Sequence, residues 1–375
     1  MIAYLDNSAT TPLCEKAKKE VINAIENCWG NPSSLHQVGI DADMLLRQAR
    51  TTLSKALKCD ADEVVFTSGG TEGNNLAIFG TAYANRRKGN RLITTKIEHP
   101  SVLGAFKRLE EEGFDVTYIG TDSSGHLDME GLEAAVDEKT ILISVMAVNN
   151  EIGTIQPIEM LRSIVKRKNA PAIIHVDAVQ AFGKLPLNPK KMGVDLMTVS
   201  SHKIHGPKGV GALFIKKGTK IRPVAVGGGQ ERDIRPGTEP MPVIAGFMGA
   251  VSELTVEKSL QKMTALRDGF ASKLRNIEGV SINSPDDALP YIVNLSLGGL
   301  RSETVLNLLS DMDIYVSSGS ACAKGHKSHV LTAMGLSDDV IDSSLRVSLS
   351  RFTTEEELDY FIEGINRAFK VIMKK

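Results

Sequence analysis

Short apolar runs, often β-branched, alternate with helical patterns between about residues 60 and 215. The first run, at 63–66, leads into a glycine-containing turn at 68–73 and then into a helical pattern through Leu76, Ala77 and Phe79. This alternation predicts βαβ units and a mainly parallel sheet of seven strands covered on both faces. Residues that do chemistry are then expected at the carboxyl ends of the strands. The other predicted strands are 91–94, 116–119, 141–145, 172–176, 196–199 and 211–215, and the helices are 101–112, 127–136 and about 158–168.

The pattern changes after the three consecutive glycines at 227–229. Apolar residues at helical spacing predict one long helix over roughly 242–277. Short strands at 292–297, 314–316 and 345–349 then alternate with helices near 302–310 and 354–371. We therefore predict an α/β protein with a large domain over 14–250 and a smaller C-terminal α/β domain over 251–375. Residues 1–13 would pack on the smaller domain, and the long helix would join the two.

The composition is that of an ordinary globular protein, with 42% apolar and 24% charged residues among 375. The net charge of −1 provides no long-range attraction to nucleic acid or anionic lipid, so neither is expected as a direct partner. No stretch is long and apolar enough to predict a membrane span, and the N-terminus shows no signal-peptide pattern. We expect a cytoplasmic enzyme.

The four cysteines are too few for a disulfide framework and lack the spacing of a metal site, so reduced thiols and no metal are expected. Cys14, Cys28 and Cys59 lie on or beside helical patterns, where an inert thiol is expected. Cys322 differs because it lies in the small-residue segment 317–323, followed by basic residues. That setting favours an exposed, reactive thiolate.

Lys203 and Asp177 carry the strongest chemical signal. Lys203 lies in a polar turn after the predicted strand 196–199, and Asp177 follows the predicted strand 172–176. A lysine amine forms a Schiff base with pyridoxal phosphate, while an aspartate keeps the pyridine nitrogen protonated. The alternatives are a solvated lysine and an aspartate that caps a helix starting at Ala178. Together the two residues predict a pyridoxal phosphate site.

Two further turns have the residues of a phosphate site. Gly70 and Thr71 follow a predicted strand and begin a helix, where free N–H groups attract a phosphate. Ser200 and His202 stand beside Lys203 and would add hydrogen bonds to the same phosphate. The alternative for the first turn is a glycine bend with a capping threonine.

Four residues are candidates for contacts with the cofactor ring or the substrate. His99 lies between a predicted strand and a helix, where an imidazole can stack on a ring and move a proton near neutral pH, or serve only the helix start. Gln180 and Asn150 could reach the ring hydroxyl, although either amide could be a loop anchor. Arg346 interrupts an apolar strand, so it needs a partner: a substrate carboxylate or a neighbouring Asp or Glu.

The chain as a whole resembles the cysteine desulfurases of the NifS/IscS type, which belong to the class V aminotransferases among the fold-type I pyridoxal phosphate enzymes. The likeness runs nearly end to end. The segment 317–322, Ser-Ser-Gly-Ser-Ala-Cys, resembles the group with a long cysteine loop. The other motifs that carry the resemblance are 6–12, 30–34, the Thr71 turn, Glu98-His99, 149–153, 175–180, 202–209 and 227–232.

The resemblance implies a homodimer that removes sulfur from L-cysteine and leaves L-alanine. It implies that Lys203 holds pyridoxal phosphate and abstracts the Cα proton, and that His99 stacks on the ring and helps deprotonate the substrate thiol. The Cys322 thiolate would attack the substrate sulfur to give an enzyme persulfide. Arg346 would bind the substrate carboxylate, with Asn150 close by, and Thr238 would reach the phosphate in the partner subunit. The sulfur would pass to an iron–sulfur scaffold or a tRNA-thiolation enzyme.

Three features depart from the family pattern. The segment 323–327 is about two residues shorter, and a shorter loop reaches less far, which bears on the sulfur acceptor. Ser201 replaces a glycine before His202, and Val226 replaces a histidine before the three glycines.

Two other functions remain open at this stage. A selenocysteine lyase or another class V aminotransferase-like enzyme would use the same cofactor site, although an aminotransferase would not need Cys322. A protein of another class, a weakly active docking partner for sulfur-transfer proteins, would keep the fold without the turnover.

Overall fold

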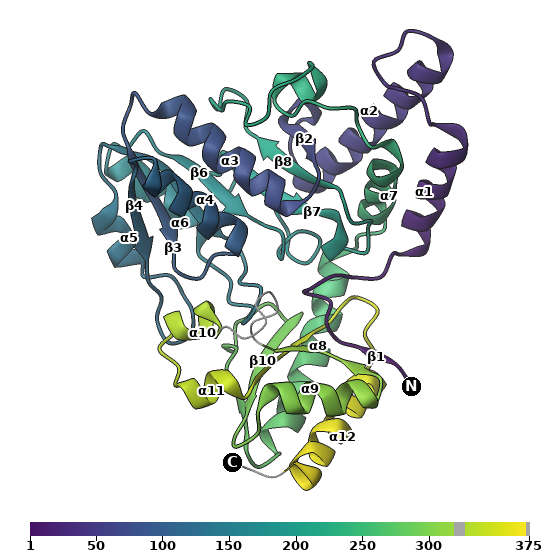
Figure 1. Ribbon diagram of the computed structural model, residues 1–375, viewed down its shortest axis with the longest axis vertical. Coiled ribbons are helices and arrows are strands. Elements are labelled where there is room, and N and C mark those ends of the chain that lie inside the picture. The colour runs from purple at the N-terminus through teal and green to yellow at the C-terminus, as the bar shows by residue number, and fades with distance from the viewer. Residues whose placement is uncertain (319–326, 373–375) are drawn as a thin grey trace.

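The computed structural model describes residues 1–318 and 327–372. Figure 1 shows a large sheet with its helices in the upper part of the molecule and a smaller sheet with α8, α9 and α12 in the lower part. The chain crosses between the two parts more than once, because the N-terminal strand β1 lies in the lower part and α1 in the upper. The carboxyl ends of several large-sheet strands face this junction.

The large sheet has seven strands in the order β2-β8-β7-β6-β5-β3-β4. Only β8 runs against its neighbours; the other pairings are parallel. The prediction of a mainly parallel, seven-stranded α/β sheet is confirmed. The strands are β2 (Val64–Thr67), β3 (Arg91–Thr95), β4 (Asp115–Ile119), β5 (Thr140–Met146), β6 (Ile173–Asp177), β7 (Leu196–Ser200) and β8 (Gly211–Ile215).

Alternating side chains explain why helices cover both faces of this sheet. Within β3, Leu92 belongs to a buried cluster with Phe106 of α4, whereas its neighbour Ile93 belongs to the main core with Leu161 of α6. Successive strand residues point to opposite faces, so a continuous apolar run needs cover on each. The helices of this part are α3 (Gly70–Asn85), α4 (Pro100–Glu111), α5 (Met129–Ala135) and α6 (Ile158–Arg167).

Three helices pack together beside the sheet. α7 (Met241–Ser252) lies against α1 (Glu15–Asn27) and α2 (Gln37–Leu57), as Figure 1 shows. The prediction of one helix over 242–277 is wrong: α7 ends at Ser252, and α8 (Val256–Arg275) begins after a break. Leu254 in the break turns toward Gly183 instead of continuing the helix. Apolar spacing alone does not reveal such a change of axis.

The smaller sheet is antiparallel, in the order β12-β13-β10-β9. β1 forms a parallel pair with β11, so the N-terminus lies in this part of the fold. The domain boundaries proposed from the sequence stay a prediction. The strands are β1 (Ala3–Tyr4), β9 (Val280–Ile282), β10 (Ile292–Leu297), β11 (Ile314–Tyr315), β12 (Ser317–Ser318) and β13 (Ser344–Ser348), and the helices are α9 (Ser302–Asp311), α10 (His329–Ala333), α11 (Asp338–Asp342) and α12 (Glu355–Val371).

Candidate active site

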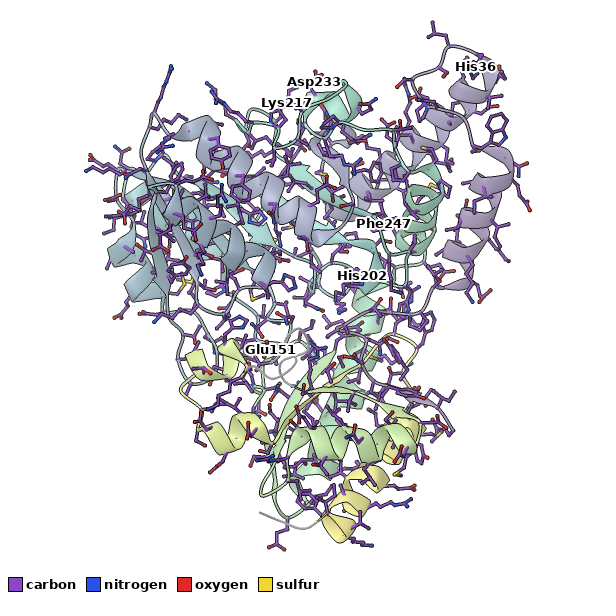
Figure 2. The ribbon with its side chains drawn as sticks, viewed as in Figure 1. His36, Glu151, His202, Lys217, Asp233 and Phe247 are labelled. Carbon is purple, nitrogen blue, oxygen red and sulfur yellow. The ribbon has the colours of Figure 1, made fainter. Side chains whose placement is uncertain are left out.

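A cavity of about 460 Å³ lies at the carboxyl ends of the parallel strands. Figure 2 labels His202 and Glu151, which border it from different segments. Thr238 is exposed and outside the lining, and Cys322 lies outside the described residues. The sequence-predicted residues that line the cavity are Gly70, Thr71, His99, Asn150, Asp177, Gln180, Ser200, His202, Lys203 and Arg346.

One end of the cavity has the features of an anion site. α3 begins at Gly70, so the free N–H groups of its first turn face this end. Gly69 has φ +150°, a conformation that favours glycine, and a Cβ at Gly70 would come within 2.8 Å of Val179 Cγ2. Ser200 Oγ is buried and makes no hydrogen bond within the part of the chain that the structure describes. A phosphate oxygen would supply the missing partner.

His202 is held in its neutral form at the same end. Its Nδ1 lies 3.2 Å from Thr10 Oγ1. Burial, together with the nearby charge of Lys203, lowers the pKa of His202 to about 4. His202 therefore offers a neutral hydrogen-bonding ring near pH 7 rather than a second positive charge.

Asp177 and Lys203 lie on adjacent strand ends. Asp177 ends β6, and its carboxylate accepts hydrogen bonds from Asn74 Nδ2 at 2.7 Å and from the backbone N–H of Val179 at 2.9 Å. Lys203 Nζ donates to the carbonyl oxygens of Ser8 and Ala9, at 2.5 and 2.6 Å. A buried carboxylate and an amine on one cavity are the donor set that a protonated pyridine ring and its aldehyde need. The residues present therefore fit pyridoxal phosphate.

His99 caps α4 and lines the cavity at the same time. The backbone N–H of Ser101 donates to His99 Nδ1 at 3.1 Å, so Nδ1 is an acceptor and the proton of the neutral ring is on Nε2. Burial lowers the pKa of His99, which keeps the ring neutral. The alternative that His99 serves only the start of a helix is thus correct in part, because His99 is the N-cap residue of α4 and also lines the cavity.

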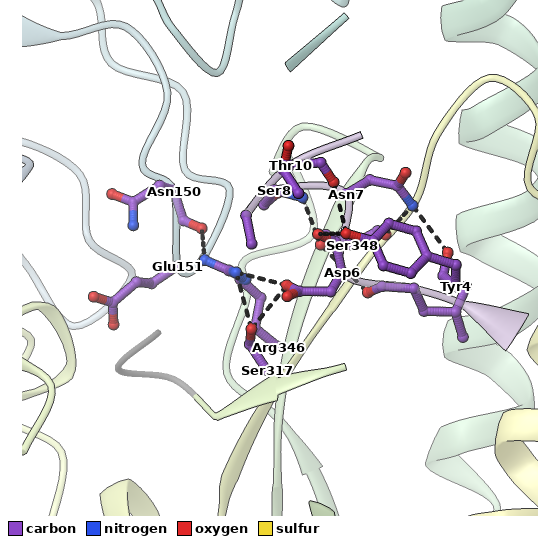
Figure 3. Close-up of polar contacts among 12 residues, drawn as sticks. Tyr4, Asp6, Asn7, Ser8, Thr10, Asn150, Glu151, Ser317, Arg346 and Ser348 are labelled. Carbon is purple, nitrogen blue, oxygen red and sulfur yellow. Dashed lines mark hydrogen bonds and ion pairs between the residues drawn. The ribbon is translucent and has the colours of Figure 1, made fainter. Parts of the chain in front are cut away.

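Arg346 is 1% exposed and comes from β13 of the smaller sheet. Figure 3 shows its guanidinium between Asp6 and the backbone of Asn150. Its Nη2 lies 2.8 Å from Asp6 Oδ1, and Nη1 donates to Asn150 O at 3.0 Å. Asp6 is therefore the neighbouring carboxylate that the alternative interpretation of Arg346 requires. Even so, Arg346 lines the cavity, and its buried Nε has no partner among the described residues.

Two contacts attach the start of α10 to the cavity wall. The Ser328 hydroxyl donates to the Glu151 carboxylate, and His329 Nε2 donates to the backbone oxygen of Glu98 at 2.9 Å. Burial raises the pKa of Glu151 to about 7, with Ser328 and the charge of Arg346 opposing the rise. Sequence reasoning did not single out Glu151, Ser328 or Asn74 as cavity residues. The available signal is their position in the sequence: Glu151 follows Asn150, Asn74 lies three residues after Thr71, and Ser328 directly follows the segment 323–327.

The three cysteines that the structure describes are poor nucleophiles. Cys14 is buried, and Cys28 and Cys59 are half-buried. Burial raises the pKa of each thiol, in Cys59 to about 12. None of the three lines the cavity. Because the thiolate is the reactive form, these residues do not compete with Cys322 as the candidate nucleophile.

The sheet order, the second smaller sheet and the lysine–aspartate cavity define a fold-type I transferase of the pyridoxal phosphate class. The aminotransferase class-V family model matches residues 3–361. The chain belongs to this family and, within it, to the cysteine desulfurases of the NifS/IscS type.

Several relatives support this membership. The chain is similar to the cysteine desulfurase IscS of Dictyoglomus turgidum, with 42% identity over 97% of this chain and 93% of the relative. The chain is also similar to the cysteine desulfurase IscS of Clostridium botulinum strain Hall, with 43% identity over 98% of this chain and 94% of the relative. A solved NifS-like protein superposes with a TM-score of 0.94 at 40% identity, covering 99% of this chain and all of that one. A structure of SspA in complex with cysteine superposes with a TM-score of 0.83 at 34% identity, covering 94% of this chain and 100% of that one.

The described residues hold neither a candidate membrane span nor a candidate metal site. Within 1–318 and 327–372, none of the helices combines the length and apolar character needed to span a bilayer. The same ranges contain no cluster of histidine, cysteine and acidic side chains arranged to hold a metal ion.

Proposed function

We propose that this protein is a pyridoxal phosphate-dependent cysteine desulfurase that converts L-cysteine to L-alanine and holds the sulfur as a persulfide on Cys322. The observation that carries the proposal is the cavity that brings Lys203, Asp177, His99 and Arg346 together from four separate segments. The names of the relatives point to the same reaction.

The phosphate of the cofactor would lie at the N-terminus of α3, bound by Gly70, Thr71, Ser200 and His202. Asp177 would pair with the ring nitrogen, while His99 would stack on the ring. Asn150 and Gln180 would lie on its hydroxyl side. When bound, pyridoxal phosphate supplies an electron sink that stabilises negative charge at the substrate Cα. The protein supplies orientation and proton transfer.

Lys203 and His99 are the residues that we propose for proton transfer. Lys203 Nζ would hold the cofactor, and as a free amine it would take the Cα proton. Neutral His99 carries its proton on Nε2 because Nδ1 accepts from Ser101. To take up the substrate thiol proton at Nε2, His99 would need the other neutral tautomer, in which Nδ1 carries the proton and donates it to Ser101 Oγ, 2.8 Å away.

The sulfur transfer needs no external oxidant. The Cys322 thiolate attacks the substrate sulfur, an S–S bond forms and the C–S bond breaks. The electron pair of the C–S bond stays with carbon, which is then protonated to give alanine. The enzyme persulfide next passes its outer sulfur to an acceptor thiol on an iron–sulfur scaffold or a tRNA-thiolation enzyme.

We propose a homodimer, which the exposed apolar surface supports, and we expect it in the cytoplasm. Apolar side chains are exposed along the α1–α2 pair and in the segment that leads to Thr238, where Val226 is 95% exposed. Exposed apolar groups gathered in this way are typical of subunit interfaces. In such a dimer Thr238 would reach the cofactor phosphate of the partner subunit. The exposed apolar residues of the α1–α2 pair are Ile22, Ile25, Trp29, Leu35, Ile40 and Met44.

A turnover assay tests the function. The purified protein, loaded with pyridoxal phosphate and supplied with L-cysteine and a thiol reductant, should release alanine and sulfide in equal amounts. Alanine from L-selenocysteine alone would instead favour the lyase. Binding of acceptor proteins with no turnover of either substrate would favour the docking partner.

Substitution of Arg346 tests the substrate site. We expect Arg346→Lys to raise KM for L-cysteine about a hundredfold while cofactor loading is kept, because lysine cannot make the bidentate contact with a carboxylate. Steady-state kinetics and the visible absorbance of the loaded protein measure the two effects. Asp6→Asn is the matched control, since it removes the ion pair with Arg346 but keeps the guanidinium. Equal loss of cofactor in both variants would mean that Arg346 only supports the fold.

A further inference from the structure

A lysine that the reaction does not use is buried behind the cavity. Lys184 is 5% exposed and lies in the segment that follows β6. Its Nζ donates to Gln180 Oε1 at 3.1 Å and lies 5.6 Å from the centre of the Tyr291 ring. A buried amine costs stability unless it is well solvated by the protein, so its retention here calls for a physical reason.

Lys184 determines which way the Gln180 amide points. A lysine amine next to an amide oxygen acts as a donor, so Gln180 must turn Oε1 toward Lys184 and Nε2 away from it. Gln180 Nε2 then donates to Ser8 O at 3.0 Å. The same Ser8 oxygen accepts from Lys203 Nζ, and both Gln180 and Lys203 line the cavity. One hydrogen-bonded chain thus connects Lys184 to the amine that attaches the cofactor.

Lys184 and Lys203 also share a second, much smaller cavity of about 20 Å³. This volume is close to that of one water molecule, which excludes a separate ligand site at Lys184. His205, Tyr291 and Arg351 are the other titratable or charged residues in its lining, and no carboxylate is among them. The Lys184 amine therefore shares this lining with Lys203, and the lining holds no carboxylate that would neutralise a positive charge on Lys184.

Mutual repulsion of the two amines is consistent with this geometry. Burial, together with the nearby charges of Lys203 and Arg346, lowers the pKa of Lys184 to about 7. Burial likewise lowers the pKa of His205 to about 4, so this ring adds no charge near pH 7. Charge on one amine disfavours charge on the other.

We propose that Lys184 is a positioning residue, which presents the Gln180 amide nitrogen to the cofactor ring hydroxyl as a donor and disfavours positive charge at the Lys203 nitrogen. This inference rests on the proposed function, because it concerns the bound cofactor. An amide that donates to the ring oxygen favours its anionic form. Both effects favour an unprotonated, reactive nitrogen at Lys203 near neutral pH.

A pH titration of the visible absorbance of the loaded protein, without substrate, tests this. In Lys184→Met the midpoint should move up by about one pH unit relative to wild type, because a nearby positive charge and the fixed donor are lost. Lys184→Gln should move it in the same direction by less, since glutamine holds Gln180 but no longer determines its orientation. Lys191→Met, an exposed lysine seven positions along the chain, is the control and should leave the midpoint in place.

Gln180→Leu separates the effect of the Lys184 charge from the effect that Lys184 exerts through Gln180. If Lys184 acts partly through Gln180, the Lys184→Met shift should be smaller in the Gln180→Leu background. A shift of full size in that background would overturn the role of Gln180. Thermal unfolding of each variant identifies a folding defect, and Lys184→Gln decides the question if Lys184→Met does not fold. A wild-type protein that takes up no pyridoxal phosphate would overturn the proposed function as well, whereas normal uptake with unchanged midpoints would overturn this inference alone.

Discussion

Lys203→Ala is expected to abolish covalent attachment of pyridoxal phosphate and to lower kcat for alanine formation by about a thousandfold or more. The ε-amine is lost in both of its proposed roles, attachment of the cofactor and transfer of the Cα proton. The visible absorbance of the purified protein and the rate of alanine release measure the two effects. Figure 2 shows Lys217 well away from His202 and hence from the cavity, so Lys217→Ala is a suitable control.

A different result would identify another attachment site. If Lys203→Ala kept the visible band through purification and denaturation, a different amine would hold the cofactor. Lys327 lines the cavity, and Lys184 is a further amine near it, through its hydrogen bond to Gln180. A residual band that disappears only in the Lys203→Ala, Lys184→Met double variant would show that Lys184 had taken over.

Cys322→Ser should retain the cofactor and bind L-cysteine but lower alanine formation by about a thousandfold or more. A serine hydroxyl is almost fully protonated near pH 7 and attacks sulfur poorly, so the C–S bond stays intact. Binding is measured by the spectral change on addition of L-cysteine, and turnover by alanine release. In the wild type, mass spectrometry should find one added sulfur atom on the peptide that contains Cys322.

Cys28→Ser is the matched control, since Cys28 is half-buried and its thiol pKa is raised by burial. This variant should keep wild-type turnover. Undiminished alanine release by Cys322→Ser would rule out the persulfide route. Added sulfur on Cys14, Cys28 or Cys59 in place of Cys322 would move the nucleophile to a residue outside the cavity lining.

Most of the sheet could be predicted from the sequence, because the strand signal is local. β8 and β10 have the predicted bounds of 211–215 and 292–297, and the other predicted strands differ by only one or two residues at their ends. The ends of helices are less local. Leu254, between α7 and α8, keeps the apolar spacing, and the break appears in the backbone, where Thr255 has a non-helical φ of −124° and ψ of 68°.

The sequence pointed to candidate residues of the site, but it did not predict the hydrogen bonds between them. Strand ends, glycine turns and the lysine–aspartate pair pointed to Gly70, Asp177 and Lys203 before any contact was known. The hydrogen bond from Ser101 that determines the His99 tautomer joins neighbouring residues, yet it depends on the backbone conformation at the start of α4. Residue type alone does not specify which nitrogen carries the proton.

By itself the sequence determined the fold class, the candidate chemistry and the family resemblance, since periodicity and motif spacing are properties of short segments. The tertiary structure alone decided that Arg346 reaches Asp6 and Asn150 across the junction of the two sheets, and that Lys184 is buried behind Gln180. The physical reason is that the partners and the burial of a charged side chain depend on the residues that surround it in the fold. Those surroundings are assembled from residues hundreds of positions apart, and the free energy of burying a charge depends on all of them.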